Sequence, residues 1–220
     1  MKNLRMIFLL ILIPLIGSCA NPIKKAVNNV KYSAYEAIGM EKRDLFKKEV
    51  KNVKKDQEQT GESFKDALEE LKAIYGFDGG KLERQYKKLN SSYEDAEKRA
   101  NEVHASVARL STVATDLFTE WRKEIGEMDS ADLRAKSMAS LGETEKKYES
   151  FFKSLKKSEA KMDPVLRKLK DQVIFMKHNL NAQAITGLKN ESAKIEGDID
   201  ALIKDMNSSI AQGDDIINSL

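Results

Sequence analysis

The sequence contains only one cysteine, two histidines and three prolines among 220 residues, and each scarcity excludes a class of structure. A single cysteine excludes any disulfide within the chain. One cysteine and two histidines far apart in sequence also cannot assemble a His/Cys metal site or a Cys-His nucleophile. Few prolines leave long stretches in which a helix can run without interruption. The composition therefore favours an all-helical protein without metal or thiol chemistry.

Aromatic residues are also few, and neither sign of charge is in large excess. Aromatics make up 7% of the chain, and 38 Lys and Arg stand against 35 Asp and Glu. This balance gives no reason to expect a nucleic-acid partner, and no GxxxxGK[ST] loop is present to bind a nucleotide. Only Glu145 and Glu159 occupy acidic positions in an apolar repeat, and their spacing corresponds to about 21 Å along a helix. We therefore expect no catalytic residues, no cofactor and no enzyme activity.

The first nineteen residues have the pattern of a secretory signal. Lys2 and Arg5 precede an apolar run, 6–16, which is too short for the roughly 20 residues of a membrane-spanning helix. The stretch Ile16-Gly17-Ser18-Cys19 resembles the lipobox of bacterial lipoproteins. That resemblance implies cleavage after residue 18 and lipidation of Cys19. The competing interpretation is an ordinary signal peptide with an incidental cysteine.

The expected location follows from this lipobox. Ala20 follows the cysteine, and by resemblance to lipoprotein sorting in Gram-negative bacteria it favours transfer to the outer membrane. Acyl chains contribute about 0.8 kcal/mol per buried methylene, so the lipids alone would hold the chain in the bilayer. We predict a signal peptide in residues 1–18, a lipidated tether in 19–29 and a helical bundle domain in 30–220. The mature protein is expected on the periplasmic face of the outer membrane.

Apolar residues that alternate in spacings of four and three predict two long helices in the first half of the domain. The first repeat comprises Phe46, Val50, Val53, Gln57, Thr60, Phe64, Ala67, Leu71 and Ile74. The second comprises Leu82, Tyr86, Leu89, Tyr93, Ala96, Ala100, Val103, Val107, Leu110, Ala114, Leu117 and Trp121. Gly76-Phe77-Asp78-Gly79-Gly80 predicts the turn between them. We interpret Gln57 and Thr60 as register-setting or tolerated positions, Trp121 as core, and His104 as a surface residue beside the repeat.

A third helix is predicted from about Ala131, after the stop at Gly126 and Asp129-Ser130. Its repeat comprises Leu141, Glu145, Tyr148, Phe152, Leu155, Glu159, Met162, Leu166, Leu169, Val173, Met176 and Leu180. Because the repeat keeps its phase through Pro164, we expect a kink there and no chain reversal. The phase changes near His178 to Asn181, where we predict a reversal with Asn181 capping a fourth helix. The alternative is one continuous helix to the C-terminus.

Four long helices with short connections predict an elongated antiparallel four-helix coiled-coil bundle. The segment 42–55 carries seven Lys and Arg against two acids, a local charge of +5. In an up-down-up-down path it would face residues 203–216, with Asp205, Asp214 and Asp215. Exposed pairs contribute only about 0 to 1 kcal/mol each, so they would select register more than stability. The alternative function of this basic segment is to contact anionic lipid headgroups.

Several segments resemble an uncharacterised group of Gram-negative lipoproteins that is known only as a domain of unknown function. They are Tyr32-Ser33-Ala34-Tyr35-Glu36, Lys42-Arg43-Asp44, Phe77-Asp78-Gly79-Gly80, Tyr86-Lys87-Lys88-Leu89-Asn90, the run from Ala160 to Leu166 and the run from Lys177 to Ala182. The resemblance covers nearly all of the mature chain. It implies an all-helical envelope protein and carries over no functional residues.

These features predict a structural or adaptor protein of the cell envelope with an envelope protein as its partner. The alternative is a carrier of an apolar ligand inside the bundle. The first and third reversals lie at the same end, so we predict a partner contact there formed by Phe77, Asp78, His178 and Asn179. Turn chemistry alone is the competing explanation for the glycines and asparagines of these segments.

Overall fold

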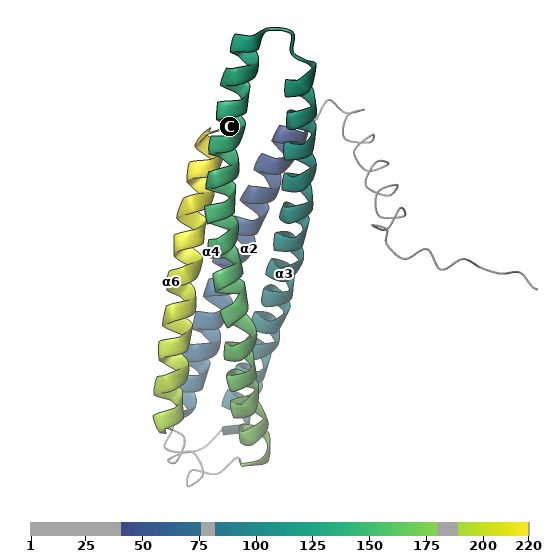
Figure 1. The fold of residues 1–220 in the computed structure, drawn as a ribbon. Coiled ribbons are helices and arrows are strands. Elements are labelled where there is room, and N and C mark those ends of the chain that lie inside the picture. Colours follow the sequence, from purple (N-terminus) through teal and green to yellow (C-terminus); the bar gives the residue numbers. More distant parts are fainter. Residues whose placement is uncertain (1–40, 76–81, 180–188, 220) are drawn as a thin grey trace, which may run out of the picture. The chain divides into compact units, whose positions relative to one another are not determined.

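A computed structural model describes residues 41–75, 82–179 and 189–219, and within these ranges the chain forms four α-helices and no strand. The helices are α2 (Lys42–Tyr75), α3 (Leu82–Glu127), α4 (Ala131–His178) and α6 (Lys189–Ser219) (Figure 1). The all-helical class and the order of long helices are confirmed. Residues 1–40, which include the predicted signal, tether and first turns of the bundle, lie outside the described residues.

The four helices pack in a closed ring. α2 packs against α3, α3 against α4, α4 against α6, and α6 against α2. Neighbouring helices run in opposite directions, so the predicted up-down-up-down path is confirmed (Figure 1). At the end where α2 begins, α3 and α4 continue past the ends of α2 and α6 as a two-helix extension (Figure 1).

The core follows the predicted repeat of the first helix throughout. All nine of its repeat positions are buried, Gln57 and Thr60 included. In α3 the repeat is buried from Leu89 to Leu117, while Leu82, Tyr86 and Trp121 near its ends are half-buried. These three positions lie near the two ends of α3, and burial is complete along its middle.

The predicted repeat of α4 needs correction. Tyr148 and Phe152 are half-buried, whereas their neighbour Phe151 is fully buried. A second row is buried as well: Thr144, Phe151, Ser158, Val165 and Gln172. The reason is that α4 contacts a helix on each side, and a helix packed in a bundle buries a face wider than a single seam.

The turn between α3 and α4 is formed as predicted. α4 begins at Ala131, and Ser130 is its N-cap, whose hydroxyl accepts a hydrogen bond from the Leu133 backbone amide at 3.4 Å. Asp132 lies in the first turn, where its charge complements the helix dipole. Local capping chemistry therefore determines where this helix starts.

α4 is one continuous helix through Pro164, so the predicted absence of a reversal there is confirmed and the kink stays a prediction. Pro164 is exposed, which leaves its ring in solvent. The helix ends at His178, and α6 is a separate helix that packs back against it. The predicted reversal is therefore confirmed, and the alternative of one continuous helix is wrong. The predicted cap Asn181 lies outside the described residues.

A buried polar layer joins three helices. The Gln57 side-chain amide of α2 donates to the Ser158 hydroxyl of α4 at 2.8 Å, and the Ser209 hydroxyl of α6 donates to the Gln57 carbonyl oxygen. All three residues are buried. These partners explain how a polar side chain is accommodated inside an apolar repeat, because a buried amide left without partners would cost about 1 to 3 kcal/mol.

Candidate functional site

Two of the four predicted partner-contact residues lie at the end of α4. His178 is its last residue and is exposed. Asn179 is the C-cap; its backbone amide donates to Met176 O at 3.2 Å and its side chain donates to Phe175 O at 2.9 Å. The side chain of Asn179 therefore serves the helix end. Phe77 and Asp78, and the predicted lipidation site Cys19, lie outside the described residues.

The two acidic repeat positions of α4 differ in burial. Glu159 is 9% exposed, whereas the Glu145 side chain is one-quarter exposed and pairs with Arg122 of α3. Each carboxylate has cationic neighbours, so neither is an isolated buried charge. Glu145 and Glu159 have different partners and lie about four turns apart along α4, so their carboxylates do not form a shared acid/base pair.

Glu159 forms the least expected cluster in the bundle. The His104 ring of α3 approaches two carboxylates of α4, with Nδ1 at 2.8 Å from Glu159 Oε1 and Nε2 at 3.3 Å from Asp163 Oδ1. Lys156 pairs with the second oxygen of Glu159. The His104 side chain is 30% exposed, so the cluster lies at the boundary between the α3/α4 contact and solvent.

The sequence predicted His104 as a surface residue beside the repeat and did not predict its contact with α4. A signal for the contact was present, because a glutamate in an apolar repeat needs a cationic or donor neighbour when it is buried. In two antiparallel helices, residues at equal distances from the connecting turn face each other. Counting from the turn between α3 and α4, the position on α4 that faces His104 is near Leu155, one helical turn before Glu159. Combining the two observations would have identified the pair.

Ion pairs between helices agree with the predicted register in part. Lys54 pairs with Asp214, as the expected facing of 42–55 and 203–216 requires. Asp205 does not pair with α2; it receives Lys157 at 2.8 Å and Lys161 at 2.6 Å from α4. Burial by itself would raise the pKa of Asp205, but hydrogen bonds and charges of these two lysines outweigh it and lower the pKa below its usual range.

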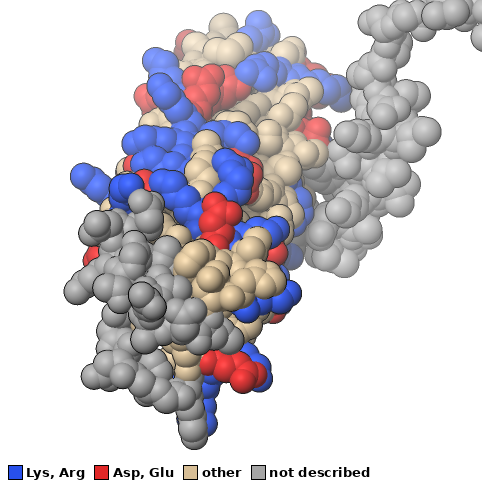
Figure 2. All heavy atoms as spheres, turned by 90° about the horizontal axis from the view of Figure 1, so that it is seen from below, with Lys and Arg blue, Asp and Glu red and all other residues tan. Residues whose placement is uncertain are grey.

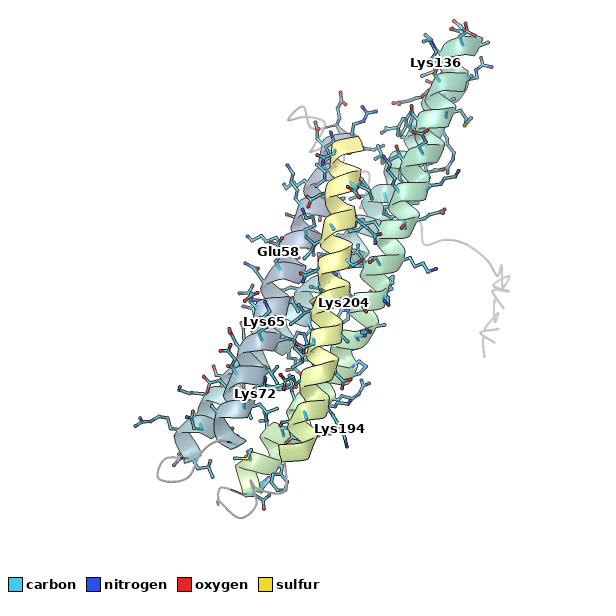
Figure 3. The ribbon with its side chains drawn as sticks, turned by 90° about the vertical axis from the view of Figure 1, so that its left-hand side faces the viewer. Glu58, Lys65, Lys72, Lys136, Lys194 and Lys204 are labelled. Atoms are coloured by element: carbon cyan, nitrogen blue, oxygen red, sulfur yellow. The ribbon has the colours of Figure 1, made fainter. Side chains whose placement is uncertain are left out.

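The surface mixes charges of both signs. The face seen along the bundle axis presents Lys and Arg beside Asp and Glu (Figure 2). Along the side formed by α2 and α6, Lys65 and Lys72 project from α2, and Lys194 and Lys204 project from α6 (Figure 3). Lys72 pairs with Glu196 across the two helices at 2.5 Å. Ion pairs of this kind show that α2 and α6 are neighbours, but they do not define a binding site.

A shallow groove lies between α2 and α6 beside the polar layer. It has a volume of about 210 Å³ and is lined by Gln57, Gly61 and Met206, with Glu58 and Lys65 at the exposed side (Figure 3). Ligand pockets usually enclose about 300 to 1,000 Å³. The groove is smaller than that and is bordered by charged side chains, which does not match a compartment for an apolar ligand.

Over residues 41–75, 82–179 and 189–219, no group of three or more His, Cys, Asp or Glu is arranged to hold a metal ion. Nor does any helix in these ranges combine the length and apolar character that crossing a membrane requires.

The comparison with protein families decides the relationship of this chain. A family model described as "Protein of unknown function (DUF2959)" matches residues 31–220. The chain belongs to this family. The DUF2959 match spans the four described helices and the segments between them, and it leaves out residues 1–30. No curated protein and no solved structure matches the chain significantly.

Proposed function

We propose that this DUF2959 protein is a lipid-anchored rod of helices that acts as a structural or adaptor protein of the cell envelope. The observation that carries the proposal is Ile16-Gly17-Ser18-Cys19, which ends an apolar run of signal-peptide length. Lipid on Cys19 would attach the chain to the periplasmic face of the outer membrane, the destination that Ala20 favours.

The bundle supports a structural role over catalysis or transport. Its interior is occupied by large side chains, among them Phe46, Phe64, Phe151 and Leu110, all fully buried. The polar layer around Gln57 is internally hydrogen-bonded, and the groove beside it is small. A rod of this kind presents long faces to a partner protein, and we expect an envelope protein to bind it.

Metabolic labelling with a radioactive fatty acid tests the anchor. Wild-type protein should incorporate label and sediment with membranes, whereas Cys19→Ala should do neither. Ser18→Ala keeps a small residue before the cysteine and serves as the matched control, which should still be labelled. Absence of label in the wild type, or membrane retention of Cys19→Ala, would refute the anchor. Recovery with the inner membrane would refute only the sorting.

Crosslinking in intact cells tests the adaptor role. We place the partner contact at the end of the bundle with Phe77 and His178, and we expect Phe77→Ser together with His178→Ala to abolish crosslinks while melting is nearly unchanged. Leu133→Ser is the control, because Leu133 is 60% exposed at the other end of α4. Early melting with crosslinks intact would make these residues a structural cap.

Native mass spectrometry distinguishes the carrier alternative. Delipidated protein extracted in detergent should show the mass of the mature chain alone. A small molecule that copurifies in stoichiometric amount would favour the carrier of an apolar ligand instead.

A further inference from the structure

The cluster around His104 has a hydrogen-bonding requirement that only one form of the ring meets. Both ring nitrogens lie within hydrogen-bond distance of carboxylate oxygens, at 2.8 and 3.3 Å. Ionised carboxylates only accept hydrogen bonds, and a neutral imidazole has a single N–H donor. The protonated imidazolium has two donors, so it alone satisfies both contacts.

The neighbours favour ionised carboxylates over a proton shared from Glu159. Lys156 pairs with the remaining oxygen of Glu159, and Asp163 is largely exposed with a side chain 62% accessible. Glu159, Asp163 and Lys156 are the charged groups of α4 at the cluster. No hydrogen bond or ion pair joins the ring to a charged group of α2, α3 or α6 among the described residues. The α3 residues one turn away are uncharged: Ala100, Asn101, Val107 and Ala108.

The position of the cluster gives it a mechanical consequence. Glu159 and Asp163 lie one helical turn apart, and Asp163 directly precedes Pro164 inside α4. Proline has no amide hydrogen, so the helix lacks one backbone hydrogen bond at this point. His104 therefore ties α4 to α3 next to the position where the helix lacks a backbone hydrogen bond.

We propose that His104 is a pH-responsive clamp that holds α4 against α3 across the Pro164 position. In the imidazolium form the ring donates to Glu159 and Asp163 together and the segment is held. When the ring loses a proton, one donor is lost, a nitrogen lone pair faces a carboxylate, and the segment loosens. The bundle stays folded, because the apolar core above and below the cluster does not titrate.

Unfolding by urea at about pH 5.5 and about pH 8 tests the clamp, because histidine is the side chain whose charge ordinarily changes within this range. The measured quantity is the unfolding equilibrium constant of His104→Gln divided by that of the wild type at the same pH. We expect it to be larger at pH 5.5 than at pH 8 by roughly tenfold, the size expected for one charge-assisted hydrogen bond. His178→Gln is the control, because the second histidine is exposed in the last turn of α4, where a cation interacts only with the helix dipole, and its ratio should change less with pH than that of His104→Gln.

Hydrogen exchange of residues 159–168 localises the effect. Compared at the same pH, His104→Gln should exchange faster than wild type at pH 5.5 and equally fast at pH 8. Asp163→Asn removes the exposed partner alone and should reduce the pH dependence without unfolding the bundle, which keeps the test valid if His104→Gln folds poorly. A ratio that is the same at both pH values, or an equal pH dependence in the His178→Gln control, would overturn the proposal.

Discussion

Gln57 shows how a single buried polar residue is retained inside an apolar repeat. Its amide has partners on two other helices, Ser158 and Ser209. Ser158 accepts from the amide and donates its own hydrogen to Leu155 O, whereas the single O–H of Ser209 has two acceptors within reach, the Gln57 carbonyl oxygen and Met206 O. Removing the amide would therefore leave neither hydroxyl without a partner.

This arrangement predicts unequal effects for two substitutions of Gln57. Gln57→Leu nearly preserves volume, and we expect it to change the free energy of unfolding by less than about 1 kcal/mol. Gln57→Ala opens a cavity and should cost about 2 to 3 kcal/mol. Urea denaturation of both variants measures the difference. Equal losses would show that the hydrogen bonds, and not the filled volume, dominate at this position.

Asp205 predicts a pH-dependent contribution to stability. Its pKa is lowered below the usual 3.8 by Lys157 and Lys161, which overcome the opposite effect of burial. A carboxyl whose pKa is lower in the folded state stabilises the protein above pH 3.8, and this stability is lost as the pH falls through the folded-state value. Asp205→Asn should therefore cost about 1 kcal/mol at pH 7, because the freed lysines reach water, and the difference from wild type should shrink below pH 4.

Asp198 of the same helix is the matched control for this experiment. It also pairs with a lysine of α4, Lys168, but both side chains are nearly half exposed. Asp198→Asn should change the free energy of unfolding by less than about 0.5 kcal/mol at either pH. If both variants change the free energy of unfolding by the same amount, burial of Asp205 does not strengthen its ion pairs with Lys157 and Lys161.

At the scale of elements, α6 contains two helical glycines in opposite environments. A Cβ added at Gly197 would meet no atom within 4 Å, whereas one at Gly213 would lie 2.9 Å from Lys54 Cδ and 3.3 Å from the Phe151 ring. Gly213 therefore allows α6 to approach α2 and α4 closely, as glycine does at tight helix contacts.

Alanine substitutions in α6 should separate helix propensity from packing. Gly197→Ala is expected to raise the free energy of unfolding by about 0.5 to 1 kcal/mol, because alanine restricts the unfolded chain and favours the helix. Gly213→Ala should lose this gain and become less stable than wild type by about 1 kcal/mol, since the Phe151 ring has to move. Denaturation midpoints compare the two. A gain at both positions would mean that the contact at Gly213 relaxes freely.

Helix boundaries and the path of the helices were predictable from the sequence, whereas the burial and pairing of individual side chains were not. Ser130, Asp132 and the phase of the apolar repeat predict the start of α4 and its passage through Pro164. The burial of Phe151 in place of Phe152, and the pairing of Asp205 with α4, depend on which two helices flank each element. That information resides in the ring arrangement of the bundle, and a single repeat read along one helix does not contain it.

At the scale of the whole bundle, the two helices with the largest net charges, α4 and α6, are of opposite sign and pack against each other. α4 carries twelve Lys and Arg against seven acids, and α6 carries three against seven. The first part of α2 is basic as well, and α2 and α4 lie diagonally while α6 packs against both. This placement puts the acidic α6 between α4 and the basic first part of α2, which explains pairs such as Lys54 with Asp214 and disfavours a ring with α2 beside α4.

The start of the folded unit is defined differently by two observations. Contacts group Lys42–Leu220 as one compact unit, whereas the DUF2959 match begins at residue 31. The bundle end at Lys42 is already closed by contacts within this unit: Lys42 pairs with Glu120 at 2.6 Å, and Arg43 lies 5.3 Å from the centre of the Trp121 ring. We therefore expect the sequence from residue 42 onward to be sufficient for folding.

Two fragments, 42–220 and 31–220, test this expectation against each other. Both should be helical by circular dichroism, elute as folded species and unfold in urea at midpoints that agree closely. The single tryptophan, Trp121, reports on the end where they differ, and its fluorescence should be the same in both because Arg43 is retained. If 42–220 unfolds much earlier or its tryptophan emission shifts to that of an exposed indole, residues 31–41 contribute to the stability of the bundle. The folded unit would then begin where the family match does.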